Sequence, residues 1–276
     1  MKKIKCIALD LDGTTLRNNG TLSERNRKAI DEAIRRGIHV IVASGRPFSS
    51  LPKEILEIDG ISFAITSNGA NGYEVKTGKR IFSHIIKEEL VDQLLQYLER
   101  NRGIIEIFVN GIPYAPREYV ECPWKFGTPE HAYAYIQKTR VPVDDIYACA
   151  RKWKKQMDSI DIMVQDLEQK EKFREAVEAI EGIYITSSVP RLLEISDIHA
   201  GKAEGLKYFS RMLGLKPDEI AAFGNAENDL DMMQYAGYGI AVSNTPEEIK
   251  NQVQYQTLSN DEDGVAVWLE QYFAKI

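Results

Sequence analysis

Short apolar runs alternate with amphipathic stretches in the first third of the chain, which predicts strands that alternate with helices. Residues 4–11 and 38–43 form apolar runs with β-branched side chains, as in strands buried on both faces. Between them, Ser23 is a suitable N-cap for a helix whose apolar positions recur with helical spacing and which ends at Gly37. A third strand is predicted over residues 62–66. Strands separated by helices favour right-handed βαβ units and a parallel sheet.

The middle of the chain has a different pattern, which combines helices with a β-hairpin. Apolar runs over 104–109 and 112–115 flank Asn110-Gly111, a pair that suits the type I′ turn of a hairpin. A leucine stripe with helical spacing precedes the hairpin, and the elements expected after it are a strand over 159–164, a helix over 171–180, and strands over 183–187 and 192–195. Hairpins together with helices favour an α+β module that contains an antiparallel sheet.

The last third returns to the alternating pattern of the first. Its expected elements are a helix over 202–213, a strand over 220–223, a helix over 230–235, a strand over 239–242 and a C-terminal helix ending near Phe273. We therefore predict an α/β fold with a Rossmann-like parallel sheet core and an inserted α+β domain. The expected boundaries are 1–84 and 191–276 for the core and 85–190 for the insert, which is an ordinary domain size.

The composition is that of a globular protein, since 43% of the 276 residues are hydrophobic and 28% are charged. The formal charge of −6, from 35 Lys and Arg against 41 Asp and Glu, argues against nucleic acid or an anionic membrane as the main partner. No apolar run approaches the roughly 20 residues that span a bilayer. The three cysteines have no CxxC spacing, which argues against a disulfide framework or a zinc site. These features predict a cytoplasmic protein.

The first predicted strand ends in Asp10-Leu11-Asp12-Gly13, and function in open parallel sheets gathers at the carboxyl ends of the strands. Two carboxylates two residues apart can point into one cleft, where a cation or a shared proton must offset their repulsion. Oxygen ligands that converge in this way suit Mg²⁺. The alternative for this segment alone is an ordinary Asp-Gly turn. A calcium EF-hand loop fits poorly, because Gly13 stands at the fourth position rather than the sixth.

Three further segments carry candidate residues at the same edge of the predicted sheet. Ser44 and Gly45 follow the second strand and could form a small anion nest, although a plain loop leading into a helix is the simpler explanation. Lys202 opens a predicted helix without a Walker A motif around it, and a lone lysine in such a place is usually solvated. The segment from Gly224 to Asp229 places four oxygen-bearing side chains close to the start of a helix, of which an N-cap explains one.

The order and spacing of these segments together resemble the haloacid dehalogenase-like hydrolases (the HAD superfamily), and within them the Cof-type sugar phosphatases. The resemblance covers nearly the whole chain, from Asp-x-Asp-Gly-Thr at residues 10–14 to Asn228-Asp229. Between these lie Ser44-Gly45-Arg46, the Asn68-Gly69-Ala70 turn and the isolated Lys202. The insert falls between the serine and lysine motifs, where this branch of the family carries an α/β cap that is expected to choose the substrate.

The resemblance implies a role for each of these residues. Asp10 is implied to be the nucleophile that forms an aspartyl-phosphate, and Asp12 to protonate the leaving alcohol and deprotonate the attacking water. Mg²⁺ is implied to bind the Asp10 carboxylate, the Asp12 backbone carbonyl and the fourth motif. The remaining contacts with the phosphoryl oxygens are implied for Ser44, the Gly45 N–H, Lys202 and Asn228.

One position departs from the family pattern. The family usually has Gly-Asp where this chain has Gly224-Asn225, so a neutral amide replaces the usual third metal carboxylate. Asn225 can still ligate a metal through its carbonyl oxygen, and Asp229 can supply charge nearby or the third contact itself. The third Mg²⁺ ligand is therefore left open between Asn225 and Asp229.

The sequence thus predicts a Mg²⁺-dependent phosphatase of small phosphorylated metabolites, above all sugar phosphates, that works as a monomer or homodimer. No nucleic acid or membrane partner is expected. The alternatives are a flavin- or pyridoxal-phosphate-type phosphatase, a phosphomutase that shares the aspartyl-phosphate step, and a catalytically weakened regulator that binds sugar phosphates. The departure at Asn225 motivates the last of these alternatives.

Overall fold

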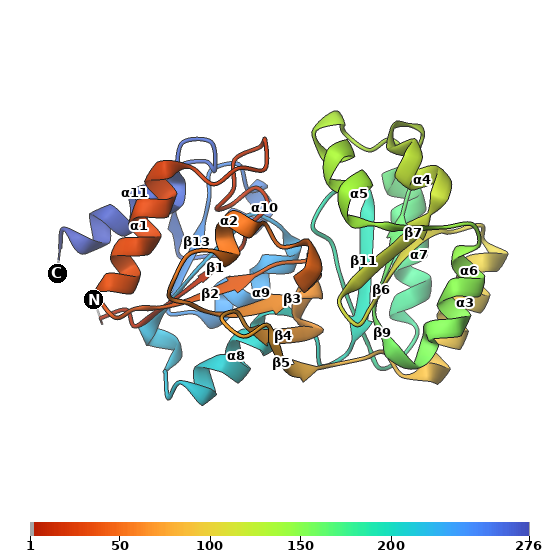
Figure 1. The fold of residues 1–276 in the computed structure, drawn as a ribbon, viewed down its shortest axis with the longest axis horizontal. Helices are drawn as coiled ribbons and strands as arrows, with labels where there is room; N and C mark the ends of the chain where they lie inside the picture. Colours follow the sequence, from red (N-terminus) through yellow and green to blue (C-terminus); the bar gives the residue numbers. More distant parts are fainter. Residues whose placement is uncertain (1–2, 276) are drawn as a thin grey trace. The chain divides into compact units, whose positions relative to one another are not determined.

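The computed structural model describes residues 3–275 and divides into two compact units, each of which can be followed in Figure 1. The core unit comprises residues 3–45, 51–82 and 201–275, and the inserted unit comprises residues 46–50 and 83–200. The core unit is therefore assembled from both ends of the chain.

The sheet of the core unit has eight strands in the order β14-β13-β12-β1-β2-β3-β4-β5. Neighbouring strands from β14 to β3 are parallel, whereas β4 runs antiparallel to β3. The strands are β1 (Cys6–Leu9), β2 (His39–Ala43), β3 (Ile61–Thr66), β4 (Asn71–Glu74), β5 (Lys79–Ser83), β12 (Ile220–Gly224), β13 (Tyr238–Ala241) and β14 (Tyr255–Gln256). The helices are α1 (Glu24–Arg35), α2 (Lys53–Leu56), α8 (Lys202–Met212), α9 (Glu227–Tyr235), α10 (Glu247–Lys250) and α11 (Gly264–Phe273).

Helices cover the core sheet because its central strands are apolar on both faces. On one face, Ile41 and Ile65 pack with Phe209 of α8 and Met232 of α9. Helix α1 packs against α11 (Figure 1). The predicted N-cap of α1 is confirmed, since the Ser23 side chain accepts a hydrogen bond from the backbone N–H of Asn26. The apolar runs predicted from the sequence thus form the centre of a parallel α/β sheet, and the predicted fold class is confirmed.

The inserted unit contains a six-stranded sheet in the order β10-β11-β9-β6-β7-β8. Its strands are β6 (Ile104–Val109), β7 (Ile112–Pro116), β8 (Val141–Val143), β9 (Met157–Met163), β10 (Ile183–Thr186) and β11 (Leu192–Asp197), and its helices are α3 (Glu88–Arg100), α4 (Arg117–Glu121), α5 (Tyr133–Thr139), α6 (Ile146–Trp153) and α7 (Leu167–Glu178). The predicted β6–β7 hairpin is confirmed. Asn110 and Gly111 have φ of 51° and 75°, as a type I′ turn requires.

Two expected boundaries are wrong. The core was expected to resume at residue 191, but β11 pairs antiparallel with β9 and β10, so the inserted unit continues to Ala200. The helix expected over 230–235 begins earlier, at Glu227. Asn228 and Asp229 consequently lie in the first turn of α9 rather than in a loop before it.

Three acidic side chains lie in a row across the sheet of the inserted unit. The register pairs Asp161 of β9 with Glu106 of β6 on one side and with Glu194 of β11 on the other, and each is at most 3% exposed. Arg140 binds both carboxylate oxygens of Glu106, at 2.8 and 3.0 Å. Burial, reinforced by the charges of Glu194 and Glu106, raises the pKa of Asp161 well above its usual range.

Replacing Asp161 by asparagine is expected to raise the melting temperature at pH 8. The pKa of Asp161 in the folded protein lies above that of the unfolded chain, about 3.9, so stability falls as the pH rises from the unfolded pKa toward the folded one. Asparagine cannot ionise, so the variant does not lose stability in this way. The difference in Tm between the variant and wild type should therefore disappear near pH 4. Thermal unfolding between pH 4 and 8 measures the effect, with Asp59→Asn at an exposed position as the control. A difference in Tm that does not depend on pH would contradict this account.

Candidate active site

The candidate site lies at the carboxyl ends of four adjacent strands of the core unit. Asp10 follows β1, Ser44 follows β2, the turn at Ser67–Gly69 follows β3, and Asn225 follows β12. Because these strands are neighbours in the order β12-β1-β2-β3, the segments that follow them share one edge of the sheet. Lys202 is the first residue of α8 and reaches the same edge, where its side chain meets Asp10.

The Lys202 ammonium lies between two buried carboxylates. Its Nζ is 2.8 Å from Oδ1 of Asp10 and 2.6 Å from Oδ1 of Asp229, and the lysine side chain is completely buried. Burial alone would lower the pKa of Lys202, but the charges of the two carboxylates outweigh burial and raise it above its ordinary value. A permanent positive charge is therefore held inside the site, and Lys202 is not the solvated lysine that its position alone suggests.

The Asp10 carboxyl group is buried and its backbone is fixed on both sides. Its N–H donates to the carbonyl of Phe223 at 3.1 Å, and its carbonyl accepts from Oγ1 of Thr15 at 2.6 Å. Burial raises the pKa of Asp10 to about 7, the charge of Asp229 acts in the same direction, and Lys202 opposes both. The charge on Asp10 therefore depends on the cations around it.

Both oxygens of Asp229 are engaged by protein donors. Oδ1 accepts from Lys202, and Oδ2 accepts from the backbone N–H groups of Asn225 and Ala226, at 2.9 and 3.1 Å. This arrangement favours a role in which Asp229 holds the ammonium and the loop after β12. A direct contact between Asp229 and a metal, which the sequence left open, would compete with the Lys202 ammonium or with these two backbone N–H groups.

Three oxygen atoms converge on the side-chain amide of Asn225. They are Oδ2 of Asp10, the backbone carbonyl oxygen of Asp12 and Oγ1 of Thr14, at 3.1, 3.0 and 3.0 Å from the amide atom that faces them. With the nitrogen inward, the two N–H bonds of the amide are shared among these three oxygens, and with the oxygen inward the Thr14 hydroxyl donates to it. With the oxygen inward, oxygen atoms face one another at the spacing of about 3 Å that neighbouring ligands have around Mg²⁺ at about 2.1 Å.

The donor set therefore fits the hard cation that the family implies, provided that the Asn225 oxygen faces inward. Residues 3–275 contain no cluster of three His, Cys, Asp or Glu side chains placed to hold a metal ion. A cation at this point would rely on one carboxylate, one backbone carbonyl and one amide. Such a set carries less negative charge than two carboxylates would, which predicts weak binding.

Asn68 connects two of the residues expected to bind phosphate, Ser44 and Asn228, by hydrogen bonds. Ser44 is buried, and its carbonyl accepts from the N–H of Asn68 at 3.2 Å, while Gly45 beside it is half-buried. The side chain of Asn228 donates through Nδ2 to Oδ1 of Asn68 at 3.0 Å. The Oδ1 atom of Asn228 is buried and has no hydrogen-bond partner among the described residues. Asp12, by contrast, has an exposed side chain.

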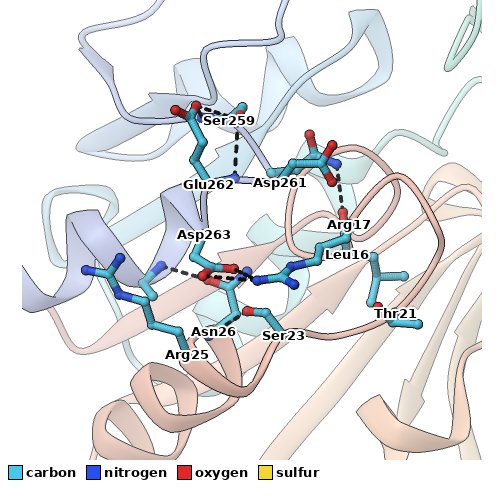
Figure 2. A network of polar contacts seen from close by, with 12 residues as sticks. Leu16, Arg17, Thr21, Ser23, Arg25, Asn26, Ser259, Asp261, Glu262 and Asp263 are labelled. Carbon is cyan, nitrogen blue, oxygen red and sulfur yellow. Dashed lines mark hydrogen bonds and ion pairs between the residues drawn. The ribbon is translucent and has the colours of Figure 1, made fainter.

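The loop that follows Asp12 is anchored to the C-terminal part of the chain. Asn244 donates to the carbonyl of Gly13 at 2.8 Å, and Asn260 donates to the carbonyl of Leu16 at 3.0 Å. Figure 2 shows Arg17 reaching the carboxylate of Asp263, with nitrogen–oxygen distances of 3.1 and 3.3 Å. These contacts fix the segment that carries Thr14 and so support the oxygen cluster at Asn225.

Sequence reasoning missed several of these residues. Thr14 directly follows the Asp-x-Asp-Gly segment, and its hydroxyl would have been found by asking which oxygens accompany the two carboxylates. Asn68 was noted only as part of a family motif. Asn244 and Asn260 lie more than 220 residues away from the loop that they anchor, and no local pattern marks them.

The family follows from a match to a sequence model. Residues 7–269 match the family described as haloacid dehalogenase-like hydrolase. The chain belongs to this family. The motifs that carry the resemblance to this family lie at the edge of the core sheet, where Lys202 contacts Asp10 and Asp229.

Individual members of the HAD superfamily match over nearly their full length. The 5-amino-6-(5-phospho-D-ribitylamino)uracil phosphatase YwtE of Bacillus subtilis is 28% identical over 97% of this chain and 98% of its own, and phosphatase YwpJ of the same organism is 29% identical over 95% and 98%. The predicted family and enzyme class, a HAD phosphatase, are confirmed.

Solved HAD structures have the same fold. A haloacid dehalogenase-like hydrolase from B. subtilis superposes with a TM-score of 0.86 at 28% identity, covering 97% of this chain and 99% of that one. The HAD subclass IIB sugar phosphatase BT4131 superposes with a TM-score of 0.83 at 22% identity, covering 97% and 98%. No helix within residues 3–275 has the length and apolar character needed to cross a membrane.

Proposed function

We propose that this HAD phosphatase is Mg²⁺-dependent and hydrolyses phosphomonoesters of small metabolites through an aspartyl-phosphate. The observation that carries the proposal is the buried Asp10 carboxylate, which has Lys202 at 2.8 Å from Oδ1 and the Asn225 amide at 3.1 Å from Oδ2. A carboxylate held between a fixed positive charge and a candidate cation site is suited to approach a phosphate dianion, which would otherwise repel it.

The proposed reaction has two displacements at phosphorus. An ionised oxygen of Asp10 attacks and forms the new O–P bond, while the ester O–P bond breaks and the leaving oxygen takes a proton from Asp12. In the second step, Asp12 takes a proton from water as the water oxygen attacks phosphorus. The bond to Asp10 then breaks, which releases inorganic phosphate and restores the carboxylate. The exposed side chain of Asp12 suits these exchanges with alcohol and water.

Other residues of the chain bind and orient the phosphoryl group in this proposal. Lys202 supplies fixed positive charge, and Ser44, the Gly45 N–H and Asn228 donate hydrogen bonds to its oxygens. Bound Mg²⁺ would supply further charge that reduces the repulsion between carboxylate and phosphate. We propose Asp10, the Asp12 carbonyl and Asn225 as the residues that hold this ion.

We propose sugar phosphates as the substrate class. The solved sugar phosphatase BT4131 shares the fold. The second candidate is a flavin-related phosphatase, because the names of two B. subtilis relatives, YwtE and YcsE, specify a phosphoribitylamino-uracil. Substrates of both classes carry a phosphate ester on a polyhydroxylated carbon skeleton. The two candidates therefore differ mainly in whether a ring such as the uracil is attached to that skeleton.

The inserted unit is proposed to choose among substrates. The support is its place in the sequence, between Ser44 and Lys202, two groups that must meet on one phosphate. Replacing residues 83–200 by a short linker is expected to preserve some hydrolysis of an aryl phosphate and to remove discrimination among metabolites. Retained discrimination would place specificity in the core unit instead.

A screen of phosphorylated metabolites tests the function directly. The panel contains sugar phosphates, the phosphoribitylamino-uracil, flavin mononucleotide, pyridoxal phosphate and a generic aryl phosphate, each with Mg²⁺ and with a chelator. We expect phosphate release that requires Mg²⁺ and is fastest for a sugar or polyol phosphate. Transfer of phosphate between two positions of a sugar would indicate a phosphomutase, and no turnover of any ester would favour the binding regulator.

Replacing Asn225 by aspartate is expected to tighten Mg²⁺ binding by about 10-fold, because a full charge replaces an amide dipole in the ligand set. The preference among substrates should not change. The measurement is calorimetric titration of both proteins with Mg²⁺, together with the half-saturating Mg²⁺ concentration for activity. Equal or weaker binding by the variant would show that this side chain is not a ligand.

A further inference from the structure

The turn after β3, at the edge of the core sheet that carries the candidate site, has an unusual backbone. Ser67 and Asn68 both have φ of 49°, and Gly69 follows with φ of 90°. Left-handed backbone is rare for residues other than glycine, and asparagine is among those that tolerate it best. Two successive non-glycine residues in this conformation, both almost fully buried, indicate a turn that the surrounding structure holds in place.

Asn68 bonds to three separate segments that carry phosphate-binding candidates. Its backbone N–H donates to the carbonyl of Ser44 at 3.2 Å, and its backbone carbonyl accepts from the N–H of Gly201 at 2.7 Å. Its side-chain Oδ1 accepts from Nδ2 of Asn228 at 3.0 Å. Asn68 is 3% exposed, so these bonds are shielded from water. The segments come from three distant parts of the chain and have Asn68 as a shared neighbour.

The turn and the start of α8 are in direct backbone contact. A Cβ added to Gly69 would lie 2.1 Å from the carbonyl oxygen of Gly201, so this position accepts only glycine without a backbone shift. Gly201 is the N-cap of α8 and has φ of 112°, and Lys202 comes next. The turn therefore sets where the helix begins and, through it, where the Lys202 side chain leaves the backbone.

We propose that Asn68 is a positioning residue for phosphoryl transfer, which fixes Ser44, Lys202 and Asn228 relative to one another. This inference rests on the proposed function of the site. Asn228 has two N–H bonds on Nδ2, and one is occupied by Asn68. Holding that bond fixes the rotation of the amide and so directs the second N–H, which is the one available to a phosphoryl oxygen. The side chain of Asn68 thus acts through Asn228 rather than on the substrate.

The alternative is that Asn68 merely suits a left-handed turn. Asn110 provides the comparison, because it also has a left-handed φ, of 51°, but lies in the hairpin of the inserted unit. Glycine keeps this backbone conformation and removes the side chain at either position. Asn68→Gly and Asn110→Gly are therefore matched in backbone conformation, and they differ in the contacts of the asparagine side chain and in its burial, because Asn68 is buried and Asn110 is exposed.

The test is a double-mutant cycle between Asn68→Gly and Asn228→Ala, read as kcat/KM for an aryl phosphate with Mg²⁺. We expect Asn68→Gly to lower kcat/KM by about 10- to 100-fold, as misplaced catalytic groups do, and Asn110→Gly to leave it within about twofold. The double variant should be within about twofold of Asn228→Ala, because the two side chains act as one unit. Losses that multiply, or an Asn68→Gly variant as fast as wild type, would overturn the proposal.

Binding of inorganic phosphate, measured by calorimetry on the same set of variants, separates this inference from the proposed function. Phosphate should bind more weakly to Asn68→Gly, with no additional loss in the double variant beyond Asn228→Ala. If the wild-type protein binds phosphate with this coupling but hydrolyses no ester, the proposed function fails, and Asn68 then positions Asn228 for phosphate binding alone. If esters are hydrolysed and neither measurement shows coupling, the positioning role fails alone.

Discussion

Asn in place of Asp10 is expected to reduce turnover of every substrate by about 10⁴-fold or more, the scale of losses when a covalent nucleophile is removed. A neutral amide does not attack phosphorus to form the hydrolysable acyl phosphate that a carboxylate forms, and the substitution also removes the carboxylate from the proposed cation site. The measurement is single-turnover and steady-state release of phosphate at saturating Mg²⁺. Turnover within tenfold of wild type would remove Asp10 from the role of nucleophile.

The same variant should fold normally, which distinguishes lost chemistry from lost structure. Burial raises the pKa of Asp10 to about 7, above the value of about 3.9 for an unfolded aspartate, so the ionised group lowers stability as the pH rises through this range. The neutral amide removes that penalty. We therefore expect Asp10→Asn, without metal, to melt no lower than wild type at pH 8, and Asp59→Asn at an exposed site serves as the control.

Removing the Lys202 ammonium is expected to damage both activity and stability. Lys202→Ala leaves Asp10 and Asp229 facing each other in a buried space without a cation, and breaking a buried ion pair in this way costs about 3–5 kcal/mol of unfolding free energy. The loss should shrink as the pH falls and Asp10 takes up a proton, because its pKa is raised in the folded state. We also expect kcat/KM to fall by about 10³-fold, because transition-state charge goes unmatched.

Lys202→Met separates charge from packing, since methionine retains most of the apolar stem. Chemical denaturation at pH 5 and pH 8, together with phosphate-release kinetics, should show that Met and Ala lose activity alike and that both lose more stability at pH 8. If affinity for the dephosphorylated alcohol falls as far as kcat/KM does, Lys202 contributes to binding of the leaving group. If Lys202→Met keeps the stability of wild type at pH 8, the two carboxylates do not need this cation.

The alternation of strand and helix in the core unit could be predicted because each element carries its own periodic signal. The β6–β7 hairpin could also be predicted, since Asn110-Gly111 favours its type I′ turn. The strand at β11 was also recognised among the elements of the middle module, but the boundary expected at residue 190 excluded it. Periodicity reports which residues of a strand are apolar and says nothing about which strand pairs with it, so it could not place that boundary.

Strand β4 was not predicted, because its local sequence favours a turn. Asn71 and Gly72 open β4, and an Asn-Gly pair is a signal for a turn rather than a strand. The pairing of Asn71 with Thr66 of β3 places it in the sheet all the same, because tertiary contacts override local preference at such positions.

The residues of the candidate site could be predicted from the sequence, but the hydrogen bonds and ion pairs among them could not. Lys202 is 192 residues from Asp10 and 27 from Asp229, and only the strand order brings its Nζ within 2.8 Å of an oxygen of each carboxylate. The sequence could therefore not show that the Asp229 oxygens accept hydrogen bonds from Lys202 and from two backbone N–H groups. Likewise, no spacing rule indicates that Asn68 touches three of the motifs.

The bond between Gly201 and Asn68 has a consequence for how this chain can change over evolutionary time. Gly201 is the first residue after the inserted unit, and its N–H is already fixed on the core turn at 2.7 Å. Whatever polypeptide precedes it, α8 starts from the same point and Lys202 emerges in the same place. An insertion, a deletion or a replacement between residues 83 and 200 therefore leaves the start of α8 and the position of the Lys202 ammonium unchanged. Under the proposed role of the inserted unit, such changes would alter substrate preference without moving this charge.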